Sequence, residues 1–301
     1  MNSESIRHNS LLRMENAVCS KNLRCLNRCD VRMGKGFHPS LEPLIETSGL
    51  SKQFGSVQAL VGLDLRIMAG EIYGLLGPNG AGKTTTIKIL TGLVEPTSGS
   101  VEVDGFDPVK NPIEVKSRIG YVAENPILYE SLTPRDFLEF VASVRKIEQG
   151  VASQRVSQLA DAFGMAQYFD SPIATLSMGM KQKVALIASF VHQPSILLLD
   201  EPLNGLDAKS SRIVKDLVSL HAQKGGAVLF STHIMEVAEH ICTRIGIIHQ
   251  GKLIAEGTLD QLRSKAGGKN ETLEEVLLKL TDEEVQVADA TRVLGEAIFS
   301  R

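Results

Sequence analysis

The pattern of apolar and polar positions changes at about residue 44. Beyond it, short apolar runs separated by turns give way to apolar runs that alternate with helical segments. The expected strands lie at residues 71–76, 119–123, 196–200 and 227–232, and the first helix at 82–92. Because strands that alternate with helices pair in parallel, the order predicts an α/β fold with a mainly parallel sheet, preceded by an antiparallel β subdomain.

A helical insertion is expected within this sheet. Residues 132–192 have a helical pattern, and Thr133, Pro134 and Asp136 together are typical of a helix start. Residues 272–280 predict another helix near the carboxyl end. We therefore expect an N-terminal extension at 1–42, a main domain at 43–262 with a helical insertion at about 126–190, and a C-terminal helical appendage at 263–301.

Composition narrows the class of protein. Of the 301 residues, 43% are hydrophobic and 22% are charged, which is ordinary for a globular domain and excludes a disordered or fibrous chain. The net charge of −3 gives no general attraction to nucleic acid, so no nucleic-acid partner is expected. Residues 1–41 carry seven Lys or Arg against three Asp or Glu, a balance typical of a flexible basic extension.

Membrane and metal signals are weak. Apolar runs such as residues 184–191 are shorter than the roughly 18 residues of a spanning helix, and the first residues lack an apolar signal-peptide core. We therefore expect a cytoplasmic protein. Cys25 and Cys29 lack the further ligands that complete a zinc site, which favours incidental cysteines over a metal site.

A glycine-rich segment between an apolar strand and a helix carries the clearest chemical signal. It matches G-x-x-x-x-G-K-[ST] through Gly77, Pro78, Asn79, Gly80, Ala81, Gly82, Lys83 and Thr84, with Thr85 next. Glycines let backbone N–H groups and a helix N-terminus approach phosphate oxygens closely. Lys83 would neutralise the phosphates, and Thr84 would offer its hydroxyl to Mg²⁺. A phosphate-loop NTPase core is favoured over a glycine-rich turn without a ligand.

Two acids follow the aliphatic run at residues 196–199. They stand at the carboxyl end of a buried strand, where open α/β sheets bind their ligands. Asp200 fits the role of Mg²⁺ partner, and Glu201 fits the general base that orients the attacking water. Alone this pattern is weak, but together with the phosphate loop at this separation it is strong. The phosphate loop by itself does not distinguish motor, kinase, GTPase and transporter classes.

Four further segments resemble those of the ATP-binding-cassette family, in the family's order between residues 44 and 258. The resemblance is carried by Leu176-Ser177-Met178-Gly179-Met180-Lys181-Gln182, Asn204-Gly205-Leu206-Asp207, Ser231-Thr232-His233 and Lys52-Gln53-Phe54-Gly55. The segment 176–182 resembles the signature motif, and 204–207 resembles the loop after the catalytic acid. The segment 231–233 resembles the one with the switch histidine, and 52–55 resembles the one that holds the adenine-stacking aromatic.

The resemblance assigns roles to single residues. Ser177 and Gly179 would contact the γ-phosphate bound by a second subunit, with Asp207 in the adjoining loop, so a head-to-tail dimer is implied. His233 would contact the γ-phosphate and the water held by Glu201, and Phe54 would stack on adenine. From residue type alone, Ser177 is an ordinary helix N-cap, His233 a solvent-exposed histidine and Phe54 a core aromatic.

This sequence departs from the family pattern at two positions. Met178 replaces a signature glycine, which makes the backbone there less free. Glu124 stands where the family usually has a Gln that senses Mg²⁺ and the permease; its oxygen can still bind the metal. Glu124, the segment 179–182 and the segment 272–276 together resemble the subgroup that serves exporter-type permeases.

The leading interpretation is an ATP-binding and ATP-hydrolysing subunit that forms a homodimer or heterodimer around ATP and Mg²⁺. A separate membrane-embedded permease would be its partner, and it would lie at the cytoplasmic face of the inner membrane. A soluble ATPase of the same family that acts on ribosomes or DNA is the alternative. An enzyme that transfers phosphoryl groups is less favoured, because no acceptor site is evident.

Overall fold

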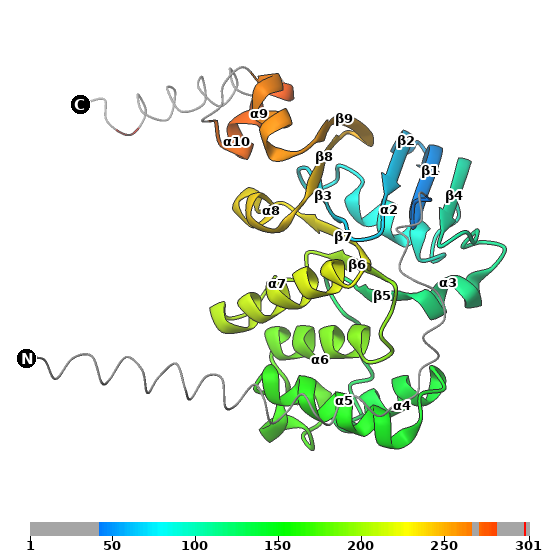
Figure 1. The fold of residues 1–301 in the computed structure, drawn as a ribbon, viewed down its shortest axis with the longest axis vertical. Helices are drawn as coiled ribbons and strands as arrows, with labels where there is room; N and C mark the ends of the chain where they lie inside the picture. Colours follow the sequence, from blue (N-terminus) through cyan, green and yellow to red (C-terminus); the bar gives the residue numbers. More distant parts are fainter. Residues whose placement is uncertain (1–41, 267–270, 282–297, 299–301) are drawn as a thin grey trace, which may run out of the picture. The chain divides into compact units, whose positions relative to one another are not determined.

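A computed structural model describes residues 42–266, 271–281 and 298 (Figure 1). The chain divides into two units, Met1–Pro39 and Ser40–Arg301. The first unit lies outside the described residues, and with it the basic extension expected at 1–42, apart from Glu42. All that follows concerns the second unit.

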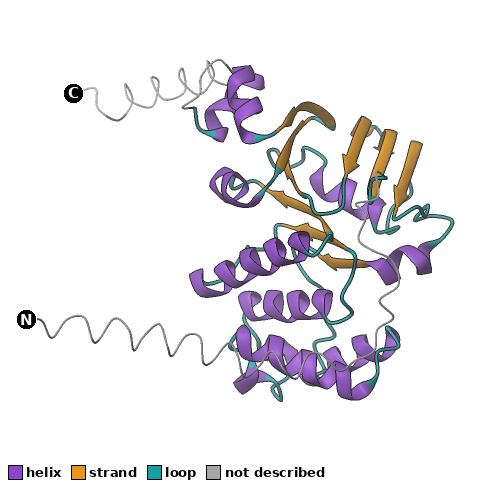
Figure 2. Ribbon diagram, in the orientation of Figure 1, coloured by secondary structure: helices purple, strands orange, loops and turns teal. Residues whose placement is uncertain are grey.

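A six-stranded sheet forms the centre of this unit (Figure 2). Its strands, in spatial order, are β5 (Ile119–Val122), β6 (Ile196–Asp200), β7 (Ala227–Thr232), β3 (Ile72–Leu76), β8 (Arg244–His249) and β9 (Lys252–Gly257). The first five run parallel, and β9 pairs antiparallel with β8. Every residue of β3, β6 and β7 is buried, which explains why the sequence shows continuous apolar runs rather than alternation.

The two faces of the sheet belong to two apolar cores. Leu198 and Leu229 face one core, which they share with the helix α2 (Lys83–Leu90). Leu197 and Phe230 face the other core, which the helical insertion fills. This alternation follows from the pleat, because successive side chains of a strand point to opposite faces.

A second sheet has three antiparallel strands in the order β2, β1, β4. These are β1 (Ile45–Phe54), β2 (Val57–Ile67) and β4 (Ser98–Val103). Its register pairs Ile45 with both Ile67 and Val103, and all three side chains are buried in the core that contains α2. The predicted antiparallel subdomain is therefore present and packs against the phosphate-loop helix.

The helical insertion begins with a capping box. The Thr133 side chain accepts a hydrogen bond from Asp136 N, and the Asp136 carboxylate accepts one from Thr133 N, as the sequence predicts. Its helices are α4 (Pro134–Val144), α5 (Gln149–Ala162), the 3₁₀ turns η1 (Ala166–Tyr168) and η2 (Ile173–Thr175), and α6 (Met178–Phe190). In Figure 1, α6 lies between α7 and the pair formed by α4 and α5, and these four helices share one core.

The remaining helices complete the unit. They are α3 (Pro112–Arg118), α7 (Ala208–Gln223), α8 (Met235–Ile241), α9 (Leu259–Ala266) and α10 (Leu273–Leu280). The boundary expected between residues 262 and 263 falls inside α9. Leu262 and Leu273 lie in one apolar cluster with Ile245 of β8, so apolar packing continues across residues 262–263. Within the described ranges, no helix is both long and apolar enough to cross a membrane.

Candidate functional site

The phosphate loop connects β3 to α2 and is pressed tightly against neighbouring strands. Gly82 has a φ of 114°, and a Cβ there would lie 2.7 Å from the carbonyl oxygen of Ala59. A Cβ at Gly77 would lie 2.1 Å from the carbonyl oxygen of Ile248. Glycine is therefore required at both positions, at Gly82 also for its left-handed backbone. The result is a short loop whose backbone can come close to a ligand.

Lys83 begins α2 and folds back across the loop. Its Nζ donates hydrogen bonds to the carbonyl oxygens of Gly77 (2.6 Å) and Pro78 (3.1 Å). Burial lowers the pKa of this amine, and the carboxylates of Glu201, Asp200 and Glu124 act in the opposite direction. A buried cation opposite several carboxylates is a strong attractor for a polyanion that arrives with its own divalent metal.

A cavity of about 350 Å³ opens in front of the loop. Nine of the residues predicted for the site line it: Asn79, Gly80, Gly82, Lys83, Thr84, Thr85, Glu124, Asp200 and Glu201. The other loop residues, Gly77, Pro78 and Ala81, support it from outside the lining; Ala81, for example, is buried and donates from its N–H to the Pro78 carbonyl oxygen. Ala59 on β2 also lines the cavity, and nothing in its residue type signals this.

The two adjacent acids have different partners. Asp200 ends β6, and its Oδ1 accepts a hydrogen bond from Ser231 Oγ at 2.5 Å. Glu201 has a φ of 49° and turns its carboxylate toward His233, whose Nδ1 lies 2.8 Å from Glu201 Oε1. A positive φ is unusual for a residue with a Cβ and is often found at functional sites.

Ser231 is a site residue that sequence reasoning missed as a separate contributor. Besides its bond to Asp200, its carbonyl oxygen accepts from Glu201 N at 3.1 Å. The signal in the sequence was a serine near the end of the apolar run that forms β7. The structure buries its hydroxyl fully, and a buried polar group needs a hydrogen-bond partner.

The residues present fit a magnesium ion. Asp200 Oδ2 is buried and has no hydrogen-bond partner, and Thr84 and Glu124 line the same cavity. In the described part of the chain, no three His, Cys, Asp or Glu side chains are grouped to hold a metal by themselves. Mg²⁺ commonly takes one or two protein oxygens and completes its shell with water and substrate phosphates, so this partial oxygen set suits it.

Two predicted residues, Ser177 and Asp207, lie outside this cavity and cap helices instead. Ser177 is the N-cap of α6 and accepts from Met180 N at 3.3 Å, while Asp207 is the N-cap of α7 and accepts from Ser210 N at 2.8 Å. Lys183 Nζ lies 2.7 Å from Asp207 Oδ2, and this hydrogen bond together with those from Ser210 holds the pKa of Asp207 well below its usual range.

Gly179, in the first turn of α6, packs against the loop that precedes α7. A Cβ on this glycine would lie 2.2 Å from the carbonyl oxygen of Gly205, so the signature segment and the loop after Glu201 are in direct backbone contact. Met178, the departure from the family pattern, is 57% exposed and causes no crowding there. The segment therefore presents the first turn of α6 to its surroundings rather than to its own phosphate loop.

Two predicted residues with aromatic rings, Phe54 and His233, are not among those that line the cavity. Phe54 ends β1 and is 49% exposed, with Lys52 Nζ 4.9 Å from its ring centroid, so the alternative that it is a core aromatic is wrong. The His233 side chain is also about half exposed, yet it contacts Glu201 rather than solvent alone. Both rings remain accessible to a ligand.

Comparison with known proteins gives a family model and related proteins. The model described as ABC transporter matches residues 60–204. The chain is 37% identical over 242 residues to the probable multidrug ABC transporter ATP-binding protein YbhF of Escherichia coli K12, covering 79% of this chain and 42% of YbhF. It therefore spans less than half the length of that relative.

Two further similarities cover most of the matched protein. The daunorubicin/doxorubicin resistance ATP-binding protein DrrA of Streptomyces peucetius is 39% identical over 223 residues, which is 74% of this chain and 68% of DrrA. A solved dimeric structure of MJ0796, a bacterial ABC transporter cassette, matches with a TM-score of 0.66 and 25% identity, covering 71% of this chain and 98% of that one.

Proposed function

Because the chain belongs to the family of ABC transporter ATP-binding proteins, we propose that it binds ATP with Mg²⁺ at the phosphate loop and hydrolyses it to ADP and phosphate. The predicted family and fold class are confirmed. The observation that carries the proposal is the convergence of Lys83, Asp200 and Glu201 on one cavity at the carboxyl edge of the sheet. Two carboxylates next to a phosphate-binding lysine suit phosphoryl transfer to water.

The two acids divide the chemistry between them. Asp200 is fixed by Ser231 through one oxygen and keeps the other without a partner, which suits a ligand to Mg²⁺. Glu201 only accepts hydrogen bonds when ionised, so His233 Nδ1 carries the shared proton and fixes the carboxylate. Glu201 is then oriented to take a proton from an attacking water, and the metal supplies charge stabilisation on the phosphates.

We further propose that a second subunit completes each site. Ser177 and Gly179 lie outside the cavity lined by their own phosphate loop, yet Ser177 begins a helix whose N–H groups suit a phosphate. A head-to-tail pair would bring this helix to the partner's nucleotide. The dimeric form of MJ0796 supports such an arrangement. Homodimer and heterodimer are both compatible with it.

Hydrolysis would drive export through a separate membrane permease. YbhF is described as a multidrug transporter protein and DrrA as a resistance protein, which supports export over import. None of the described helices could span a membrane. The relatives are named as transporter or resistance ATP-binding proteins, which supports a membrane-embedded partner for translocation. The chain would then act at the cytoplasmic face of the inner membrane as a peripheral subunit.

A nucleotide titration tests the binding step. Lys83→Ala should abolish tight ATP binding, since the cavity loses the side-chain cation that faces its acids. Lys88→Ala is the matched control, because Lys88 is an exposed lysine of the same helix outside the cavity. Equal nucleotide affinity in the parent and Lys83→Ala, measured by fluorescence of a labelled ATP, would overturn the assignment.

A further inference from the structure

A second cavity lies at the opposite edge of the six-stranded sheet from the phosphate loop. It has a volume of about 560 Å³ and lies between α5, the end of α6 and the end of α7. Ser195, directly before β6, lines it, whereas Asp200 at the other end of β6 lines the nucleotide cavity. At about 3.3 Å per residue, the five residues of β6 place the two cavities roughly 16 Å apart. They are therefore separate sites.

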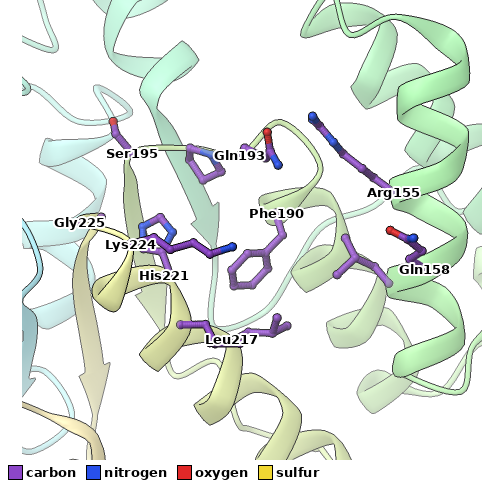
Figure 3. A pocket seen from close by; sticks show the side chains of 13 residues that line it. Arg155, Gln158, Phe190, Gln193, Ser195, Leu217, His221, Lys224 and Gly225 are labelled. Carbon is purple, nitrogen blue, oxygen red and sulfur yellow. The ribbon is translucent and has the colours of Figure 1, made fainter. Parts of the chain in front are cut away.

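The walls of this cavity combine apolar surface with positive charge. Figure 3 shows Arg155 of α5 and Lys224 after α7 on opposite sides, with the Phe190 ring between them. Leu159 and Leu217 extend the apolar wall. No Asp or Glu is among the lining residues, all of which are described.

The two cations remain available to a ligand. Arg155 donates from one guanidinium nitrogen to the carbonyl oxygen of Val191 at 3.1 Å, which positions the group and leaves its other N–H groups unused. Across the described ranges, neither Arg155 nor Lys224 is engaged in an ion pair. The cavity thus holds two unpaired cations at its rim and no compensating carboxylate.

His221 adds shape rather than charge. Its ring lines the cavity, but Nε2 is buried without a partner beside Gly226, where an added Cβ would lie 2.1 Å away. Burial lowers the pKa of His221, so the ring is neutral at neutral pH. The positive charge therefore comes from Arg155 and Lys224 alone.

We propose that this cavity binds an amphipathic organic anion, with its acidic group between Arg155 and Lys224 and its apolar body against Phe190 and Leu217. The volume lies within the roughly 300–1,000 Å³ of small-molecule sites, which are mostly apolar with a few polar groups that fix orientation. A purely apolar ligand would leave both cations without a counter-charge. An inorganic anion would leave the apolar wall in water.

Titration of the full chain with 1-anilinonaphthalene-8-sulfonate, an aromatic anion that fluoresces in apolar surroundings, tests the proposal. We expect one probe molecule per chain, displacement by decanoate but not by decanol, and no displacement by saturating ATP. Lys224→Glu should weaken binding at least about tenfold, because one charge-assisted contact is lost and an anion is added. Lys215→Glu, the same change on a part of α7 outside the cavity, should alter affinity less than about twofold.

A second variant tests the volume instead of the charge. Gln158 is an exposed lining residue, so Gln158→Trp fills the cavity without disturbing the core and should weaken probe binding about tenfold. Thermal unfolding of each variant checks that the fold is retained. Absence of binding, displacement by ATP, or equal affinities in the parent, Lys224→Glu and Gln158→Trp would overturn the proposal. None of these outcomes depends on whether ATP is hydrolysed.

Discussion

Replacing Glu201 by Gln should separate ATP binding from hydrolysis. The substitution keeps the size of the side chain and an oxygen that can still accept from His233 Nδ1, which now lies 2.8 Å from Glu201 Oε1. It removes the negative charge and the basic oxygen. Backbone strain is unchanged, because Glu and Gln tolerate the φ of 49° equally poorly. The fold should therefore persist.

The expected loss follows from the role of a general base. Such a base contributes about 10²–10⁴-fold to the rate, so turnover should fall by about that factor, or roughly 2.7–5.5 kcal/mol in activation free energy. ATP binding should not weaken, because the substitution removes one of the three carboxylates in the cavity that repel the negatively charged phosphates. The variant should accumulate as a dimer loaded with ATP.

Removal of the carboxylate also changes the pH dependence of binding. Burial lowers the pKa of Lys83, and Glu201 is the strongest of the three acids that raise it. Without Glu201 this pKa falls further, so the protonated amine is lost at a lower pH. ATP affinity should therefore begin to decline at lower pH in Glu201→Gln than in the parent, when binding is titrated in alkaline buffers.

Light scattering with and without ATP, together with phosphate release, measures both effects. Glu139→Gln is the matched control, since Glu139 is an exposed acid of α4 that does not line the cavity. Adding Ser177→Arg to Glu201→Gln should dissociate the trapped dimer, because bulk and positive charge then occupy the N-terminus of α6. A Glu201→Gln protein that stays monomeric at saturating ATP, or that hydrolyses at the parental rate, contradicts the shared-site mechanism.

Three further substitutions test single contacts. Ser231→Ala removes the hydrogen bond to Asp200 Oδ1 and should raise the Mg²⁺ concentration needed for half-maximal ATP binding about tenfold. Ser231→Thr should restore the parental Mg²⁺ requirement, and neither variant should change ATP binding without metal. Equal Mg²⁺ requirements in the parent and Ser231→Ala would refute the positioning role. Phe54→Ala should weaken nucleotide binding by about 1–3 kcal/mol by calorimetry with little preference for the base, and an unchanged affinity would argue against stacking. Glu124→Gln should retain more permease-stimulated hydrolysis than Glu124→Ala, and equal rates would show that the Glu124 oxygen is not a ligand.

Much of the central sheet could be predicted from the sequence, because three of its strands are buried on both faces. The ranges 196–200 and 227–232 match β6 and β7, and 71–76 differs from β3 by one residue. Such strands are continuous apolar runs that end abruptly at polar residues, so their limits are visible. The phosphate loop could be placed for the same reason, since the strand before it and the helix after it were both evident.

Contacts between distant parts of the chain could not be predicted. The clustering of Leu262 with Ile245 and Leu273, on both sides of the expected boundary at 262–263, depends on how three elements meet rather than on any local pattern. The positive φ of Glu201 likewise depends on a contact with a distant part of the chain. Its N–H is held by Ser231, 30 positions away, and no residue in its own segment signals a left-handed backbone.

The roles proposed for Asp200 and Glu201 also rest on partners that are remote in sequence. They are consecutive acids, both at most 5% exposed, and residue type alone does not tell a metal ligand from a base. Ser231 and His233 are two residues apart at the end of β7. Ser231 contacts Asp200, and His233 contacts Glu201. Because Ser231 binds only Asp200 Oδ1, the other carboxylate oxygen, Oδ2, stays buried without a partner. The contact with His233 holds the Glu201 carboxylate, and Glu201 lines the cavity. Exchange of the two acids would therefore place a longer side chain against Ser231 and a shorter one before His233, and neither contact could form as it does here.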